Sequence, residues 1–290
     1  MLNMNYFITN QKIDYNKKLK YLITIPCVNR EERNAINVIQ RTFQSFEKSH
    51  MFNSDIDFTI VLFESGSKDT SYLDFINEYK EKYCNEYKEK YCNENNNSKK
   101  IEIVYSTVPL NGITNTLKMF FYINKLPENS FDFVIWMDDD VYVCSNFIKN
   151  ADIWIKNYAN FSIFSSLYVP YNSFPIQNRK YVQLANLPGF YGTCCTIFKP
   201  KLSKFVMPTW FHSHFQKWDY NPDTRFRDSI RMKFPYAKKI CVSYPSLVQH
   251  MNIGSAIKMK KQVNKGHKTK TFIGEDNDPQ LYINDISYNT

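Results

Sequence analysis

Four short apolar runs separated by helical patterns constrain the fold of this chain more than any other feature. The runs are Tyr21 to Pro26, Phe58 to Phe63, Ile101 to Tyr105 and Phe133 to Met137, and a helical pattern from about Ile113 to Leu126 leads into the last of them. Runs of this length are typical of buried strands. Strands that alternate with helices form a mainly parallel sheet with helices on both faces. The sequence therefore predicts a Rossmann-like, mixed but mainly parallel α/β fold.

Composition limits the class of protein. The chain has 290 residues, of which 43% are hydrophobic, so it can bury a full core. Its formal net charge of +9 suits an anionic partner such as a nucleotide, a phosphate or a nucleic acid. The seven cysteines are an odd number without a C-x-x-C pair, which argues against a disulfide framework and a zinc ribbon. With no signal peptide and no long apolar run, a soluble chain in the cytoplasm and no membrane span are expected.

The fourth apolar run ends in three consecutive carboxylates, Asp138, Asp139 and Asp140. Adjacent carboxylates repel one another and lose hydration at a strand end, so a cation is their natural partner. On an extended segment, Asp138 and Asp140 point to the same side and Asp139 points away. This spacing suits a nucleotide-sugar, with Asp138 near the ribose and Asp140 on a metal that bridges the diphosphate. The alternative is an acidic helix start, in which Ser145 caps the helix that follows.

The apolar strand that ends in D-x-D resembles the donor and metal motif of GT-A glycosyltransferases. Three more segments are similar in order and spacing to the N-acetylglucosaminyltransferase IV family, which branches N-glycans: Thr24 to Phe46, Pro188 to Phe198 and Pro245 to Ile257. The resemblance spans most of the chain. It implies a GT-A fold and an inverting transfer of a sugar, N-acetylglucosamine, from a UDP-sugar to a hydroxyl of a glycan or glycoprotein. The implied cofactor is Mn²⁺ or Mg²⁺.

The resemblance also implies donor-binding positions at the carboxyl edge of the sheet, and Asp138 and Asp139 of the aspartate motif are among them. Pro26 ends the first predicted strand, so Val28 and Arg30 fall at this edge, where a guanidinium binds phosphate or stacks on a base. A plain surface arginine is the alternative for Arg30. Glu64, at the end of the second strand, is a candidate acceptor of hydrogen bonds from uracil or ribose. A solvated turn residue is the alternative for Glu64.

Two glycines and a histidine complete the donor and metal positions that we expect. Gly189 and Gly192 frame an aromatic turn where a sugar or acceptor can approach the backbone, although turn geometry alone also explains them. His250 follows a strand-like segment from Val242 to Val248. The resemblance implies that His250 completes the metal shell with Asp140, and a lone structural histidine is the alternative.

An inverting transfer needs a general base beside the acceptor hydroxyl, and this base lies outside the D-x-D motif. Asp223 and Asp228 are the candidates, because family members carry an aspartate on the corresponding helix shortly before the last strand. Asp223 is expected at or near the N-cap of this helix, so capping is its alternative role.

The expected organisation is an N-terminal extension over residues 1–18, a catalytic domain over 19–257 and a basic tail over 258–290. Within the catalytic domain, the donor half spans about 19–143 and the acceptor half about 144–257. The tail opens with the basic run Lys258 to Lys270, which either folds over the leaving diphosphate or is a solvated charge run. The tandem octapeptide NEYKEKYC, Asn77 to Cys92, is expected only to lengthen a surface helix.

Two other functions stay open from the sequence. A catalytically silent nucleotide-sugar-binding module would keep Asp138, Asp140 and Arg30 without turnover. A nucleic-acid-binding protein would use the net charge and the many aromatic residues, but no nucleic-acid motif is present, so no nucleic acid is expected as a partner. Members of the resembled family usually carry a membrane anchor and a further domain, neither of which is expected here. The abundance of Asn, Lys, Tyr, Phe and Ile is typical of AT-rich genomes such as those of protists and large DNA viruses.

Overall fold

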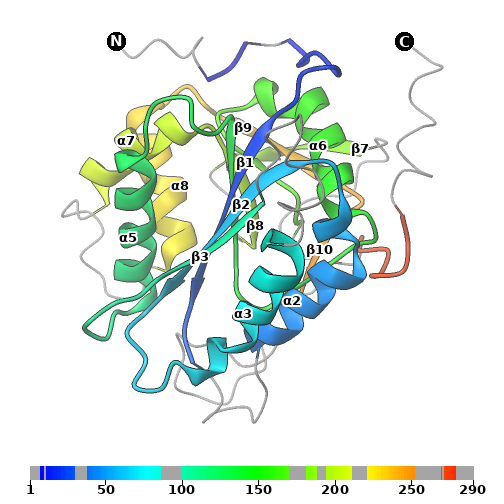
Figure 1. The fold of residues 1–290 in the computed structure, drawn as a ribbon. Helices are drawn as coiled ribbons and strands as arrows, with labels where there is room; N and C mark the ends of the chain where they lie inside the picture. Colours follow the sequence, from blue (N-terminus) through cyan, green and yellow to red (C-terminus); the bar gives the residue numbers. More distant parts are fainter. Residues whose placement is uncertain are drawn as a thin grey trace.

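A central mixed sheet with helices on both faces organises the protein, as its computed structural model shows (Figure 1). The structure describes residues 7–9, 11–29, 38–85, 99–169, 181–187, 194–210, 221–251, 269 and 271–278. In spatial order, the strands of the central sheet in these residues are β3 (Lys100–Val104), β2 (Asp57–Glu64), β1 (Lys20–Cys27), β4 (Phe133–Met137), β8 (Cys195–Phe198), β6 (Ser165–Ser166), β9 (Lys239–Tyr244) and β7 (Tyr181–Asn186).

The direction of these strands confirms the predicted fold class. β3, β2, β1 and β4 are parallel, and β6 is parallel to β9. β8 runs antiparallel to both of its neighbours, and β7 runs antiparallel to β9. A second, small sheet pairs β5 (Val141–Val143) with β10 (Val248–His250). The architecture is the Rossmann-like, mainly parallel α/β sheet expected for the GT-A class.

The helices cover the sheet in two groups (Figure 1). One face carries α2 (Val38–Lys48), α3 (Phe75–Tyr79) and α6 (Phe147–Tyr158). The other face carries α5 (Gly112–Lys125), α7 (Ser203–Val206) and α8 (Pro222–Lys233). Each group packs on its own apolar core, and the sheet separates the two cores.

Strand β4 shows why the apolar runs fold as they do. Phe133, Ile135 and Met137 join the core beneath α2 and α6, whereas Val134 and Trp136 join the core beneath α5 and α8. A strand that is buried on both faces needs apolar side chains at every position, so it appears in the sequence as a continuous run. The four predicted strands are β1, β2, β3 and β4, and β1 extends one residue beyond Pro26.

The first copy of the tandem octapeptide packs on α2. The copy begins in α3 and continues into a π-helical turn, Lys80–Asn85. The hydroxyl groups of Tyr79 and Tyr83 donate to the Glu47 carboxylate at 3.2 and 2.5 Å. The copy is therefore helical, as predicted, and it also contributes to the core through the buried Tyr79. The second copy lies outside the described residues apart from its first position.

Segments near both ends of the chain lie on α6. The amide of Ile13 donates to the carbonyl of Lys156 at 2.8 Å. The carboxylate of Asp278 accepts hydrogen bonds from the Nδ2 atoms of Asn146 and Asn150 at 2.7 and 3.0 Å. Asn146 precedes the helix in a left-handed conformation with φ 51°, so the alternative in which Ser145 caps this helix is wrong. The division into extension, catalytic domain and tail stays a prediction. In the described part of the chain, no helix combines the length and apolarity that a bilayer crossing requires.

Candidate metal and donor site

The three aspartates form the turn between β4 and β5, beyond the carboxyl ends of the parallel strands. The amide of Asp138 donates to the carbonyl of Cys194, before β8, at 3.2 Å. The amide of Met251, after β10, donates to the carbonyl of Asp140 at 2.8 Å. The turn is therefore held by β8 on one side and by β10 on the other, and it is not the acidic helix start that the sequence left open.

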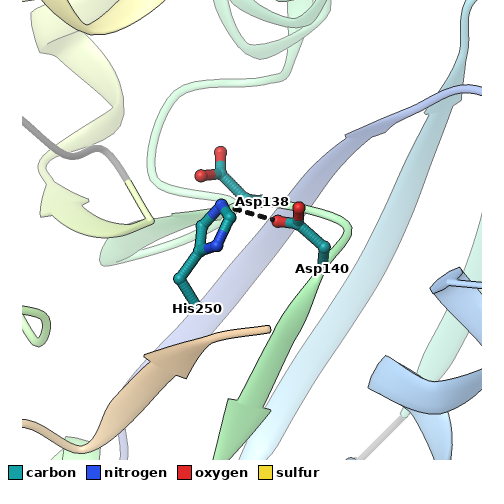
Figure 2. Close-up of side chains that lie close together, drawn as sticks. All are labelled: Asp138, Asp140 and His250. Atoms are coloured by element: carbon teal, nitrogen blue, oxygen red, sulfur yellow. Dashed lines mark ion pairs between the residues drawn. The ribbon is translucent and has the colours of Figure 1, made fainter. Parts of the chain in front are cut away.

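Asp138, Asp140 and His250 converge at this turn (Figure 2). One ligand atom from each residue lies within 4.8 Å of the others, and His250 Nε2 is 3.3 Å from Asp140 Oδ1. The Asp140 side chain is 4% exposed and that of His250 is 18% exposed, and Asp138 is also only partly buried, so the cluster is accessible to solvent at Asp138 and His250. The antiparallel pairing of β10 with β5 sets His250 opposite Val141, the residue after Asp140.

The donor atoms of this triad fit a divalent cation. Carboxylate and imidazole ligands lie about 2.0–2.2 Å from such ions, so atoms on one ion are up to about 4 Å apart. The observed limit of 4.8 Å needs only small side-chain adjustments to reach that spacing. Carboxylates suit Mg²⁺ and Mn²⁺, and an imidazole nitrogen favours transition metals over Mg²⁺. The mixed set therefore suits Mn²⁺ better than Mg²⁺.

The sequence predicts His250 after a strand-like segment, and the structure shows that this segment belongs to two strands. The strand-like segment from Val242 to Val248 is divided at Pro245 between β9, in the central sheet, and β10, in the small sheet. His250 is the last residue of β10. The histidine therefore reaches the aspartates through its own two-stranded ladder.

Asp139 serves a different contact from its neighbours. Its Oδ2 atom accepts a hydrogen bond from the amide of Val28 at 3.4 Å, and the residue is 3% exposed. Its carbonyl accepts from Thr42 Oγ1 of α2 at 2.7 Å. Two predicted donor-binding residues, Val28 and Asp139, thus contact each other, and the loop after β1 is joined to the aspartate turn. No pattern in the sequence indicates this contact of Thr42.

Glu64 closes the turn that follows β2. It is fully buried, and its two carboxylate oxygens accept hydrogen bonds from the amides of Gly66 and Ser67 at 2.7 and 2.9 Å. The alternative of a solvated turn residue is therefore wrong. Lys118 of α5, another residue that the sequence did not indicate, donates to the carbonyls of Glu64 and Val104 at 3.3 and 3.0 Å. The lysine links the ends of β2 and β3. A contact of Glu64 with uracil or ribose stays a prediction.

Gly66 is the residue in this turn that tolerates substitution least. Its φ is +81°, and a Cβ added there would lie 2.2 Å from the carbonyl oxygen of Val108. The left-handed backbone costs a residue with a side chain about 1–2 kcal/mol, and overpacking against backbone adds about 1–3 kcal/mol. We expect Gly66→Ala to lower the free energy of unfolding by roughly 2–5 kcal/mol, measured by denaturant titration.

Gly274→Ala is the matched control for that measurement. Gly274 also has a positive φ, +101°, but its added Cβ would meet only the side-chain nitrogen of Asn277 at 3.3 Å. Its cost should be limited to the backbone term. Equal losses for both variants would show that the contact of Gly66 with Val108 adds nothing.

The two candidate bases on α8 have different surroundings. Asn221 caps the helix by accepting from the amide of Thr224 at 3.0 Å, and Asp223 lies in the first turn, near the N-cap as expected. The alternative in which Asp223 itself caps the helix is therefore wrong. Asp228 is bound by guanidinium groups: Arg227 donates to both of its oxygens at 2.8 and 3.0 Å, and Arg231 donates at 3.3 Å.

Electrostatics place Asp223 near the aspartate turn. Burial raises the pKa of Cys194 well above its ordinary value, and the charges of Asp138, Asp140 and Asp223 raise it further. The same three carboxylates act on Tyr168, whose pKa is also raised, chiefly by burial. Asp223 therefore shares with the triad the neighbourhood of Tyr168 and Cys194. Asp228 is not among the main causes of either shift.

Several predicted positions fall outside the described residues. They are Arg30, Gly189, Gly192 and nearly all of the basic run from Lys258 to Lys270. Their predicted roles stay predictions.

The chain has structural neighbours among known proteins. No protein-family model matches the chain. No curated protein matches it. Among solved structures, two crystal structures of S. aureus TarS each align over 78% of this chain with a TM-score of 0.48, at 14% and 15% sequence identity. The alignments cover 35% of one TarS chain and 57% of the other, which consists of residues 1–349. At this level of similarity, TarS identifies neither the family nor the activity of this chain.

Proposed function

We propose that the protein is a metal-dependent, inverting glycosyltransferase that moves a sugar from a UDP-sugar to a glycan hydroxyl. The convergence of Asp138, Asp140 and His250 at the carboxyl edge of the parallel strands carries this proposal. Ligands of open α/β sheets bind beyond this edge. A cluster of carboxylates there, with an imidazole beside it, is suited to an ion that carries a diphosphate.

We assign the ion and the nucleotide of the donor to different parts of the site. Asp140 and His250 would hold the divalent ion, and Asp138 lies within reach of the same ion or of the ribose. When bound, the ion offsets negative charge on the leaving diphosphate. The loop after β1, which begins at Val28, and the turn closed by Glu64 border the site on the side of β1 and β2. They are the surfaces that we assign to the nucleotide.

Asp223 is the base that we assign to the transfer. Its carboxylate would accept the proton of the acceptor hydroxyl while that oxygen attacks the anomeric carbon. The bond from the anomeric carbon to the diphosphate oxygen breaks as the new bond forms, so the configuration inverts without a covalent enzyme intermediate. Asp228 suits this role less, because two arginines already bind its oxygens. The electrostatic effect of Asp223 on Cys194 and Tyr168, which the triad carboxylates also affect, supports a position near the triad.

The proposal also names the donor sugar and the metal ion. We infer N-acetylglucosamine as the sugar from the similarity of the sequence to N-acetylglucosaminyltransferase IV enzymes. We infer Mn²⁺ from the imidazole that joins the two carboxylates. The acceptor is a glycan or glycoprotein hydroxyl.

Thermal denaturation with a panel of nucleotide-sugars tests this proposal. UDP-N-acetylglucosamine with Mn²⁺ should raise the melting temperature by roughly 5 °C at a ligand concentration about 100 times its Kd, since binding then adds about 2.7 kcal/mol. The same ligand in chelator should have little effect, because the proposed site joins carboxylates to diphosphate through the ion.

The controls separate the proposal from its rivals. ADP- and GDP-sugars with Mn²⁺ should stabilise the protein less than UDP-sugars do. Equal stabilisation by the UDP-sugar with and without chelator would contradict a metal-bridged site. Stabilisation by UDP-sugar and Mn²⁺ without turnover on any glycan acceptor would instead indicate a silent binding module.

A further inference from the structure

We propose that Thr42 of α2 is a positioning residue for Asp140, and hence for the metal site; this inference rests on the proposed function. The Thr42 hydroxyl donates to the carbonyl of Asp139 at 2.7 Å and accepts from the amide of Val141 at 3.2 Å. That carbonyl and that amide belong to the two peptide groups on either side of Asp140. A single hydroxyl therefore forms hydrogen bonds with both peptide groups that flank the Cα atom of Asp140 and so restrains the position of its side chain.

The position of the hydroxyl is itself well defined. Thr42 is fully buried, and its helix packs into the core through Ile39, Phe43 and Phe46. The β-branched threonine side chain has few rotamers in a helix, and one of them is selected here by two hydrogen bonds. The aspartate turn is thus anchored to a rigid helix rather than to another loop.

Successive turns of α2 hold successive parts of the site. Ser45, one turn after Thr42, accepts a hydrogen bond from the amide of Val143 in β5 at 2.9 Å. β5 pairs with β10, which carries His250. Ser49, the residue that follows the end of α2, donates at 2.7 Å to the carbonyl of Phe46 in the last turn of the helix. The helix therefore supports the Asp140 peptide groups through Thr42 and the His250 ladder through Ser45, whereas Ser49 supports neither.

The effect on metal binding follows from the precision that a metal site needs. Ligands must be held within about 0.5 Å of their working positions. Without the Thr42 hydroxyl, a buried carbonyl and a buried amide would both lose a partner, and the turn would move to recover hydrogen bonds. Loss of such an outer partner typically weakens metal binding about 10- to 100-fold.

Titration of the full chain with Mn²⁺, followed by the electron paramagnetic resonance signal of the free ion, tests this inference. Thr42→Val keeps the shape of the side chain and removes the hydroxyl, so Kd for Mn²⁺ should rise roughly tenfold or more. Thr42→Ser keeps the hydroxyl, so its Kd for Mn²⁺ should lie within about twofold of the wild-type value, since both hydrogen bonds can still form. Ser49→Ala removes a buried hydroxyl just beyond the end of the same helix and should leave Kd unchanged.

The outcomes separate this inference from the proposed function. If Thr42→Val binds Mn²⁺ as tightly as Ser49→Ala does, the positioning role is overturned and the metal site stands. If the wild-type chain binds no divalent ion, both are overturned. Melting temperatures of the wild type and Thr42→Val in chelator identify a purely structural effect. Such an effect would lower the melting temperature of Thr42→Val without raising the Kd of its folded form for Mn²⁺, and this result would also overturn the positioning role. Thr42→Ala replaces Thr42→Val if the valine variant does not fold, and the same increase in Kd is then expected.

Discussion

Asp223→Asn should lower the rate of sugar transfer by roughly a hundredfold or more while leaving Mn²⁺-dependent binding of the UDP-sugar near its wild-type strength. The asparagine keeps the shape of the side chain but cannot accept the proton of the acceptor hydroxyl. The helix cap is provided by Asn221, so the substitution leaves the start of α8 intact. Single-turnover transfer rates and donor titrations on the same preparation measure the two effects separately.

Asp228→Asn is the matched control, because the two aspartates lie on the same helix. Its carboxylate holds Arg227 and Arg231, so we expect a small loss of stability and a transfer rate close to that of the wild type. The reverse result, with full activity in Asp223→Asn and none in Asp228→Asn, would move the base by one and a half helical turns. An unchanged rate and an unchanged melting temperature in Asp223→Asn alone would remove this residue from the mechanism.

Asp140→Asn and His250→Ala should each abolish most of the Mn²⁺-dependent stabilisation by UDP-sugar and lower the transfer rate by at least about a hundredfold, since the ion accounts for several kcal/mol of charge stabilisation. Asp140 and His250 contribute two of the three ligand groups, and the buried Asp140 also pairs directly with His250 at 3.3 Å. Thermal shifts with and without chelator measure the binding effect.

Asp139→Asn provides the comparison within the same turn. Its carboxylate contacts the amide of Val28 and is not part of the triad, so its loss should weaken donor binding less than the loss of Asp140 does. A larger effect from Asp139→Asn than from Asp140→Asn would mean that the side chains of the turn are arranged differently from those described above.

The parallel half of the sheet could be predicted from the sequence because burial on both faces leaves a continuous apolar run. FVIWM is such a run, and its end marks the aspartate turn. The strands after residue 143 were harder to predict from the sequence. β6 has two residues and β8 has four, too few for a periodic pattern of apolar residues. Their places in the sheet depend on partners far away in the chain, and local patterns do not contain that information.

The site residues also divide into those that local sequence patterns could predict and those that depend on contacts with distant parts of the chain. Asn221 could have been recognised as the helix cap, because Pro222 favours the first helical position and puts the cap one residue before it. His250 was predicted to join Asp140, but the ladder between β5 and β10 that brings it there has no signature in either strand alone. Thr42 lies three residues after Ile39, which indicates a buried helix face. Nothing in that spacing indicates that its hydroxyl binds the aspartate turn.

The ladder between β5 and β10 also determines when in folding the metal site can exist. A chain that has reached only residue 143 contains Asp138 and Asp140 but lacks the strand that carries His250. The chain must extend about a hundred residues further and form β10 before all three ligand groups are in place. Nascent or truncated chains that end before β10 therefore lack the complete ligand set, so the proposed ion can bind to all three groups only after β10 has been synthesised and has paired with β5.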